Sequence, residues 1–304
     1  MRTVLQVLII GIQNGAILSL VGLGLALVYK ATRILNFAQG EMATVPAFAA
    51  YLVMTGFVVA GDPVVSKGRL WLATIVAIVF GALLGILVNM LVIRRLTAVS
   101  PVTSLVATAA VFLFFTSIEV NRFEAKLRRF PRYVEGGFRI PGVNITVEWH
   151  TIVVLVVLGG AAALLALFFQ TPPGVALLAT AQEPFAAELQ GVPVARMRSM
   201  AWGAAGVLAA IAGLLGAGKF NNLQPALVTT TFLIPAFTGA VLGGLTSMVG
   251  AVAGGLILGV TVAAANQINT SFSLGIPGAP QLATFLVLLL VLVFRPSGLF
   301  GQEA

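Results

Sequence analysis

Long, uninterrupted apolar runs separated by short polar stretches occupy almost the whole chain. The runs do not alternate every second residue, so they predict helices rather than the strands of a membrane barrel. Several reach the roughly 20 residues that a helix needs to cross a bilayer. The pattern predicts about nine crossings, with eight and ten as alternatives, over Val4–Tyr29, Met42–Gly61, Leu70–Val92, Ser104–Val120, Thr151–Phe169, Met200–Gly218, Thr230–Leu245, Ser247–Gln267 and Leu282–Phe294.

The composition strengthens this interpretation. Of the 304 residues, 59% are hydrophobic and 9% are charged, whereas an ordinary soluble domain has about 25% charged residues. Lipid offers no water to backbone groups, so helices that bond internally are favoured. We therefore expect an all-α membrane protein, a polytopic helical bundle that forms a single transmembrane domain over residues 1–304. The first apolar run is too long for the core of a cleavable signal peptide and is expected to be retained.

Two polar segments, residues 121–150 and 170–199, are long enough to carry structure of their own. In the first, apolar and polar residues alternate around Pro141-Gly142, which predicts a hairpin with a type II turn. In the second, Ala176–Gln190 is rich in alanine and leucine and predicts a short amphipathic surface helix. Pro172-Pro173 before this stretch and Gly191 after it are typical helix boundaries.

The segment Asn36–Glu41 places three polar side chains, Asn36, Gln39 and Glu41, between two apolar runs. A charged group at membrane depth is costly and usually faces a cavity. The alternative is a solvated loop, with Glu41 near the start of the next helix, where the helix dipole favours a carboxylate. The residues alone leave both interpretations open.

Other polar residues in the apolar runs allow similar alternatives. Gln13 and Asn14 lie inside the first run, where they either line a polar path or join helices by hydrogen bonds. Glu119 ends an apolar run just before a basic loop, so we expect a salt bridge at the membrane surface rather than a proton relay.

Glycines gather in the C-terminal half at spacings that let membrane helices approach closely. These glycines form a stripe that comprises Gly239, Gly243, Gly244, Gly250, Gly254, Gly255 and Gly259. The stripe would serve either tight helix packing or an interface between helices that move against each other.

Sequence signals for catalysis or cofactor binding are weak. Gly213–Lys219 matches GxxxxGK, but Phe220 stands where a phosphate-binding loop needs Ser or Thr, and the stretch ends a hydrophobic run. His150 is the single histidine and cysteine is absent, which argues against a zinc site. We therefore expect no catalytic residue, no metal and no cofactor. The net charge of +8 is spread over the loops and fits anionic lipid better than nucleic acid.

Four segments together resemble the permease subunits of ABC importers of the branched-chain amino acid type. Arg33–Glu41 reads RILNFAQGE and resembles the family signature Asn-Phe-Ala-His-Gly-Glu. Gly174–Val192 resembles the family's cytoplasmic loop, Phe237–Gly255 its glycine-rich late segment, and Arg295–Phe300 its C-terminal ending. The four occur in the family's order and span essentially the whole chain.

This resemblance implies a multi-pass, pore-forming subunit of the bacterial inner membrane without enzymatic activity. It would move amino acids, branched-chain or related small solutes, inward by alternating access. Its partners would be two cytoplasmic ABC ATPases, a second permease (homologous or identical) and a periplasmic solute-binding protein. Residues 121–150 would then be extracytoplasmic and residues 170–199 cytoplasmic. The implied translocation residues are Gln13, Asn14, Asn36, Gln39 and Glu41, and the implied ATPase-coupling residues are Leu178, Glu183, Pro184, Ala187, Glu188 and Gly191.

The chain departs from the family pattern at three positions. Gln39 stands where the family usually has His, and Leu178 and Glu188 stand where relatives commonly have Arg. The implied outer loop carries six basic residues, although the positive-inside rule prefers them inside; they would suit an acidic patch on a binding protein. An autonomous channel or secondary carrier for small neutral solutes, such as urea or amides, is the alternative, but it would need no coupling helix.

Overall fold

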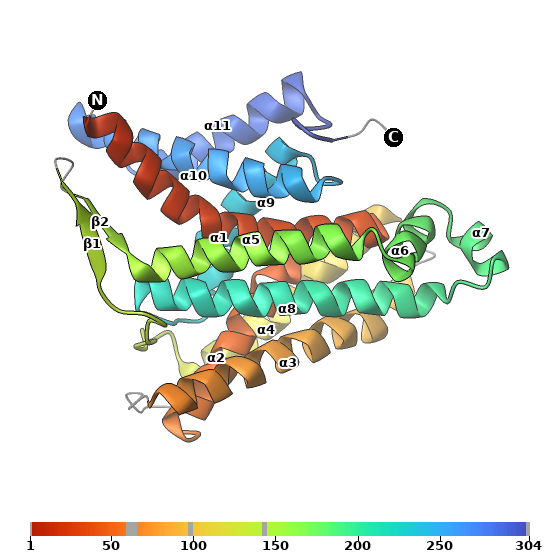
Figure 1. Cartoon of the computed structure of the whole chain (residues 1–304). Helices are drawn as coiled ribbons and strands as arrows, with labels where there is room; N and C mark the ends of the chain where they lie inside the picture. Colours follow the sequence, from red (N-terminus) through yellow and green to blue (C-terminus); the bar gives the residue numbers. More distant parts are fainter. Residues whose placement is uncertain (1, 59–65, 97–99, 142–144, 302–304) are drawn as a thin grey trace.

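The computed structural model describes residues 2–58, 66–96, 100–141 and 145–301 (Figure 1). Almost all regular structure in these ranges is helical, as predicted, with one small hairpin. The helices are α1 (Arg2–Thr32), α2 (Glu41–Thr55), α3 (Lys67–Leu91), α4 (Pro101–Phe123), α5 (Trp149–Phe168), α6 (Pro172–Gln182), α7 (Pro184–Leu189), α8 (Val194–Phe220), α9 (Ile234–Gly243), α10 (Met248–Ser271) and α11 (Ala279–Phe294), and the strands are β1 (Gly137–Ile140) and β2 (Ile145–Glu148).

Six helices in the described part of the chain are long and apolar enough to cross a membrane: α1, α3, α4, α5, α8 and α10. The remaining apolar helices, α2, α9 and α11, are shorter. Each of the nine predicted segments falls on one of these helices, but the structure itself supports six full-length spans rather than nine.

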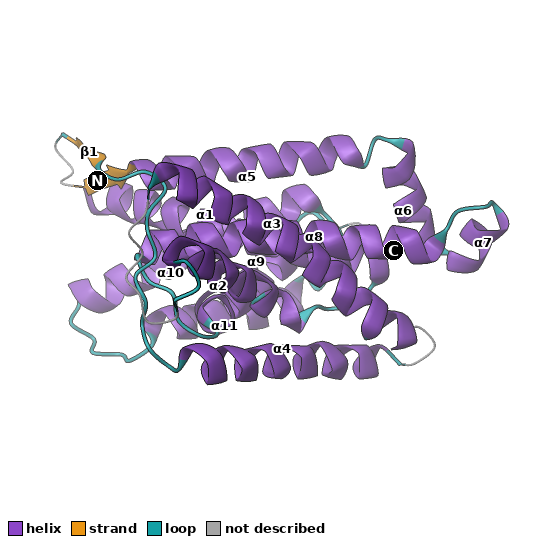
Figure 2. Cartoon of the chain, turned by 90° about the horizontal axis from the view of Figure 1, so that it is seen from below, coloured by secondary structure: helices purple, strands orange, loops and turns teal. Residues whose placement is uncertain are grey.

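The bundle has two distinct ends, the hairpin end with β1 and β2, and the opposite end with α6 and α7 (Figure 1). Since α5 follows β2 and precedes α6, it runs from the hairpin end to the α6–α7 end, and α8 runs back. The last turn of α1 packs with α6 and the start of α8, through Ala31, Leu177 and Met197. Hence α1 runs in the same direction as α5. Figure 2 shows α4 and α5 along opposite sides of the bundle.

The packing pattern occurs twice, with the direction of the chain reversed. The first helix of each set of three packs along the third helix of the other set: α1 packs along α10, and α8 packs along α3. The half-length helix α2 packs against α8 and α3, while the half-length α9 packs against α1 and α10. Because α1 and α8 run in opposite directions, α1–α2–α3 and α8–α9–α10 form an inverted repeat. Repeats of this kind place two broken helices at the centre of a bundle.

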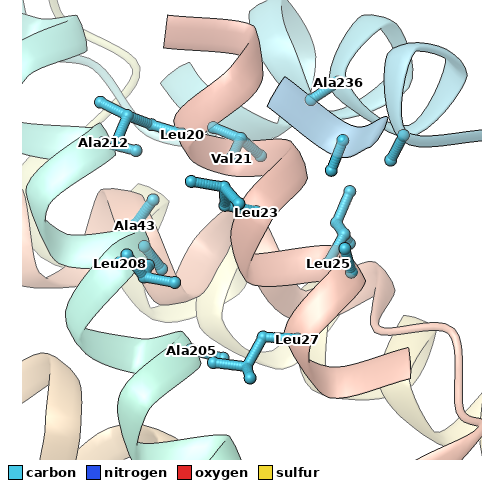
Figure 3. Packing of buried hydrophobic residues seen from close by; sticks show 14 of the residues in the cluster. Leu20, Val21, Leu23, Leu25, Leu27, Ala43, Ala205, Leu208, Ala212 and Ala236 are labelled. Atoms are coloured by element: carbon cyan, nitrogen blue, oxygen red, sulfur yellow. The ribbon is translucent and has the colours of Figure 1, made fainter. Parts of the chain in front are cut away.

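The core lies where α1 and α8 meet the two half-length helices. Figure 3 shows Leu27 of α1 against Ala205 of α8, and Ala43 of α2 beside Leu208. Alanines and glycines make up most of the buried face of α8, and α8 is the most deeply buried of the long helices. Small side chains let these helices approach closely, so central packing rests on contact between backbones as well as side chains.

The surface helix predicted over Ala176–Gln190 is wrong as a single element. The chain forms α6, breaks at Glu183, and resumes as α7 from Pro184. Proline has no N–H to continue the ladder and forces the residue before it out of helical geometry. Glu183 accordingly has φ −142° and ψ 89°. Pro172 and Pro173 lie in the first turn of α6, where proline is tolerated, rather than before it.

The predicted hairpin is present. Strands β1 and β2 are antiparallel, with Phe138 opposite Val147 and Ile140 opposite Ile145. The predicted turn at Pro141-Gly142 extends beyond the described residues, which stop at position 141 and resume at 145.

Candidate translocation site

The chain between α1 and α2 is irregular and passes through the interior of the bundle. Arg33 has φ +57°, and a short 3-10 turn, Phe37–Gln39, precedes α2. Asn36 caps this turn, since its side-chain oxygen accepts from the Ala38 N–H at 3.1 Å. All three polar side chains of the segment, those of Asn36, Gln39 and Glu41, are buried. The solvated-loop alternative for this segment is therefore wrong.

The first two of these side chains bond to each other and to α8. The Asn36 amide donates to Gln39 Oε1 at 2.9 Å, and the Gln39 amide donates to the Ala205 carbonyl at 3.2 Å. Ala205 lies well inside α8, about two-fifths of the way along it. Gln39 thus joins the irregular segment to the central helix near mid-depth of the bundle.

Glu41 opens α2 and is enclosed by α4. Its Oε1 accepts from the Thr116 hydroxyl at 3.0 Å, and its carboxyl lies within hydrogen-bonding reach of the Glu119 carboxyl. Glu119 Oε2 accepts from the Ala226 N–H at 2.8 Å. The expected surface salt bridge of Glu119 is therefore wrong: Thr116 and Glu119, almost one turn apart, share the face of α4 that looks inward.

The second half-length helix begins at the same place. A π-helical turn, Thr229–Leu233, leads into α9. Thr229, the first residue of this turn, lies so close to Gly40 that a Cβ on Gly40 would overlap the Thr229 side chain. The N–H of the preceding residue, Val228, donates to Thr44 Oγ1 at 3.2 Å. The starts of α2 and α9 thus meet in the interior. Each helix start carries a partial positive charge from its unpaired N–H groups.

The space at this meeting point is small. Asn36 borders a cavity of about 30 Å³ whose other walls are apolar, among them Leu25, Leu233 and Phe237. About 10–15 Å³ is needed for one water molecule in this measure. The cavity therefore has room for a few waters at most, and we call this conformation, in which Asn36, Gln39 and Glu41 are buried, the closed one.

The two polar residues of the first span have separate surroundings. Asn14 accepts from Lys219 Nζ at 2.8 Å, which joins α1 to α8, and it also borders a cavity of about 240 Å³ with Asn266 and Gln267. Gln13 is half-buried, and its amide nitrogen has no hydrogen-bond partner. The structure does not bring either of them to the Asn36–Glu41 segment.

The residues expected to couple to an ATPase lie on α6, α7 and the turn after them. Glu183, Glu188 and Gly191 are exposed, Leu178 and Pro184 are half-buried, and Ala187 is buried within the chain. Two residues that the sequence reasoning missed, Phe185 and Leu189, are 70% and 72% exposed. Helix α7 extends beyond the bundle (Figure 1), so these apolar side chains are open to a partner.

The glycines of the late segment lie where helices touch backbone to backbone. A Cβ at any of the helical ones would overlap a neighbouring helix, and Gly244 (φ +99°) meets the C-terminal segment instead. The close contacts join Gly239 with Gly254 and Gly255, Gly243 with Gly250, Gly255 with Ser19, Gly259 with Gly11 and Gly15, and Gly244 with Ser297 and Gly301.

Sequence comparison places these features in a known family. Residues 7–294 match the model of the family described as branched-chain amino acid transport system / permease component. No solved structure matches the chain significantly.

Curated relatives of similar length carry corresponding names. The chain is 27% identical to the high-affinity branched-chain amino acid transport system permease protein BraD of Pseudomonas aeruginosa, covering 98% of this chain and 96% of the relative. It is 25% identical to a probable branched-chain amino acid transport permease protein LivH of Methanocaldococcus jannaschii (94% and 89%), and 24% identical to LivH of Escherichia coli K12 (98% and 96%). These relatives are transport components, not enzymes. The chain belongs to the branched-chain amino acid transport permease family and is a multi-pass membrane protein.

Proposed function

We propose that this chain is the membrane subunit of an ABC importer that moves amino acids, branched-chain or closely related, inward by alternating access. The observation that carries the proposal is the meeting of two half-length helices at a buried polar cluster, Asn36, Gln39, Glu41 and Glu119. Transporters built from inverted repeats bind solutes at such breaks. Family membership favours this function over an autonomous channel for neutral solutes.

The chemistry of the cluster suits an amino acid. Helix starts carry partial positive charge that favours a carboxylate, and side-chain carboxyls favour an ammonium group. In the closed conformation the Asn36 amide donates to Gln39, and the Gln39 amide donates to the Ala205 carbonyl. Opening would exchange these bonds for bonds to the solute, so passage would need no tight binding.

We infer the orientation from the resemblance of the α6–α7 segment to the family's cytoplasmic loop. The α6–α7 end would face the cytoplasm and contact partner ATPases, and the hairpin end would face a solute-binding protein. The N-terminus would then lie outside and the C-terminus inside, in the bacterial inner membrane. In this arrangement α11 and the two half-length helices α2 and α9, with the irregular segments before them, would add three traversals to the six full-length spans and give nine. A second permease, related or identical, would complete the pore.

The test is transport by the complete importer in proteoliposomes. Glu41→Ala should lower uptake about 10-fold or more, because loss of a buried hydrogen bond to a charged group costs about 1.5–3 kcal/mol. Co-purification with the ATPases should be unchanged. Glu135→Ala, in an exposed loop, is the control. Normal uptake by an intact Glu41→Ala complex would contradict the proposal.

A further inference from the structure

Two acidic side chains from different helices face each other in the interior. Glu41 of α2 is 0% exposed and Glu119 of α4 is 2% exposed, and their carboxyls lie within hydrogen-bonding reach of each other. One oxygen of each has a donor, Thr116 for Glu41 and Ala226 for Glu119. The other two oxygens, Glu41 Oε2 and Glu119 Oε1, are buried without a donor.

Among the described residues, no cation forms an ion pair with either acid. The groups that face the pair are the Thr116 hydroxyl from α4, and the Ala226 N–H and Thr229 hydroxyl from the segment before α9. Two buried or half-buried cations contact other groups: Arg128 bonds the Phe123 carbonyl and lies over the Tyr51 ring, and Lys219 bonds Asn14.

Two ionised carboxylates in contact would repel each other strongly at this depth, where water does not screen them. Neither could donate a hydrogen bond to the other. A single proton removes both problems, because the protonated carboxyl donates to its partner and satisfies the two remaining oxygens. Such O–H···O⁻ bonds are short and strong. The remaining negative charge is favoured at the first residue of α2 by the helix dipole.

We propose that Glu41 and Glu119 form a proton-binding site that holds one shared proton in the closed conformation. The shared proton would link α2 to α4. Ala226 and Thr229, which belong to the other repeat, contact the two acids at this point. This site is a property of the folded chain and does not depend on a transport role of Glu41. Its test is therefore separate from the uptake assay.

Infrared spectroscopy of the full-length permease in lipid nanodiscs tests the proposal, since a protonated carboxyl has a carbonyl-stretch band that an ionised one lacks. The chain has nine Asp and Glu residues, so the band can be assigned. At neutral pH the wild type should show it, and Glu41→Gln and Glu119→Gln should each abolish it. Glu124→Gln is the matched control: Lys126 hydrogen-bonds the exposed Glu124 and lowers its pKa, so the band should persist.

Thermal unfolding across a pH series gives a second readout that a merely structural role would not change. The folded pair holds a proton that the unfolded chain, with ordinary glutamates, does not hold near neutral pH. The shared proton therefore makes its full contribution to the free energy of unfolding at low pH. This contribution is lost as the pH rises past the value at which the folded pair releases its proton. Both Gln variants should lose this pH dependence, while Glu124→Gln keeps it. A band and a pH slope that are the same in wild type and both Gln variants would overturn the proposal.

Discussion

At the residue scale, the sequence identifies polar groups in apolar runs but not their partners. The segment Asn36–Glu41 stands out because three polar side chains interrupt a hydrophobic pattern. The role of Glu119 could not be foreseen, because a basic loop follows it in sequence while its neighbour in space is Glu41. His150 shows the same effect: it follows the polar segment 121–149 in sequence, yet it is buried and its Nε2 lies 2.9 Å from the Leu215 carbonyl oxygen.

A residue-scale prediction concerns Asn36. Its side chain caps the 3-10 turn and bonds Gln39. Asn36→Ala should therefore destabilise the chain by about 1–2 kcal/mol, from the lost cap and the unpaired Gln39 oxygen. The measurement is the melting temperature of the purified permease in nanodiscs. Asn266→Ala, at an exposed position on α10, should change it little. Equal melting of the two variants would mean that the Asn36 bonds contribute nothing to stability.

At the element scale, hydrophobic runs predict where helices lie but not how far each extends. Helix α2 ends at Thr55, where Gly56 adopts φ +68°, although apolar residues continue beyond it. Its half length follows from its start in the interior, which depends on tertiary contacts of Gly40 and Glu41 with distant parts of the chain. The break between α6 and α7 has a local cause in the sequence, because Pro184 forces Glu183 out of helical geometry.

The glycine contacts between helices yield the second prediction. Gly243→Leu should lower the yield of assembled complex severalfold, because the added side chain would overlap the α10 backbone at Gly250 and overpacking costs about 1–3 kcal/mol or more. Gly159→Leu on α5 is a matched control, since nothing lies near its added atoms. The measurement is the yield of monodisperse complex by size-exclusion chromatography. Normal yield from Gly243→Leu would show that α9 and α10 can separate freely.

A third prediction concerns α7. Ala187→Arg would disturb the chain's own packing, since Ala187 is buried, so the exposed Phe185 and Leu189 are the sharper probes. Leu189→Asp should reduce solute-stimulated ATP hydrolysis at least severalfold, because a charge would enter an apolar contact with the ATPase. The fold of the permease should be unaffected. Glu135→Gln, in the exposed loop before β1, is the control and should leave the stimulation unchanged. Unchanged stimulation in Leu189→Asp would exclude α7 from the coupling contact.

At the scale of the whole molecule, composition predicts an all-α membrane protein but not the inverted repeat. The repeat consists of matching packing relations between helices that run in opposite directions, such as α1 with α10 and α8 with α3. Local hydrophobicity contains no information on these relations. The repeat explains why two half-length helices begin at one buried point, and why the polar signature segment lies there.

During transport the closed cluster should open to water. The chain has no cysteine, so a single Leu233→Cys, at the wall of the small cavity, can be labelled selectively with a water-soluble thiol reagent in the complete importer. Phe57→Cys, 75% exposed, and Leu158→Cys in the core are the accessible and inaccessible controls. We predict that position 233 is protected at rest and becomes labelled when ATP and loaded binding protein drive turnover. Protection that persists throughout active transport would contradict the account.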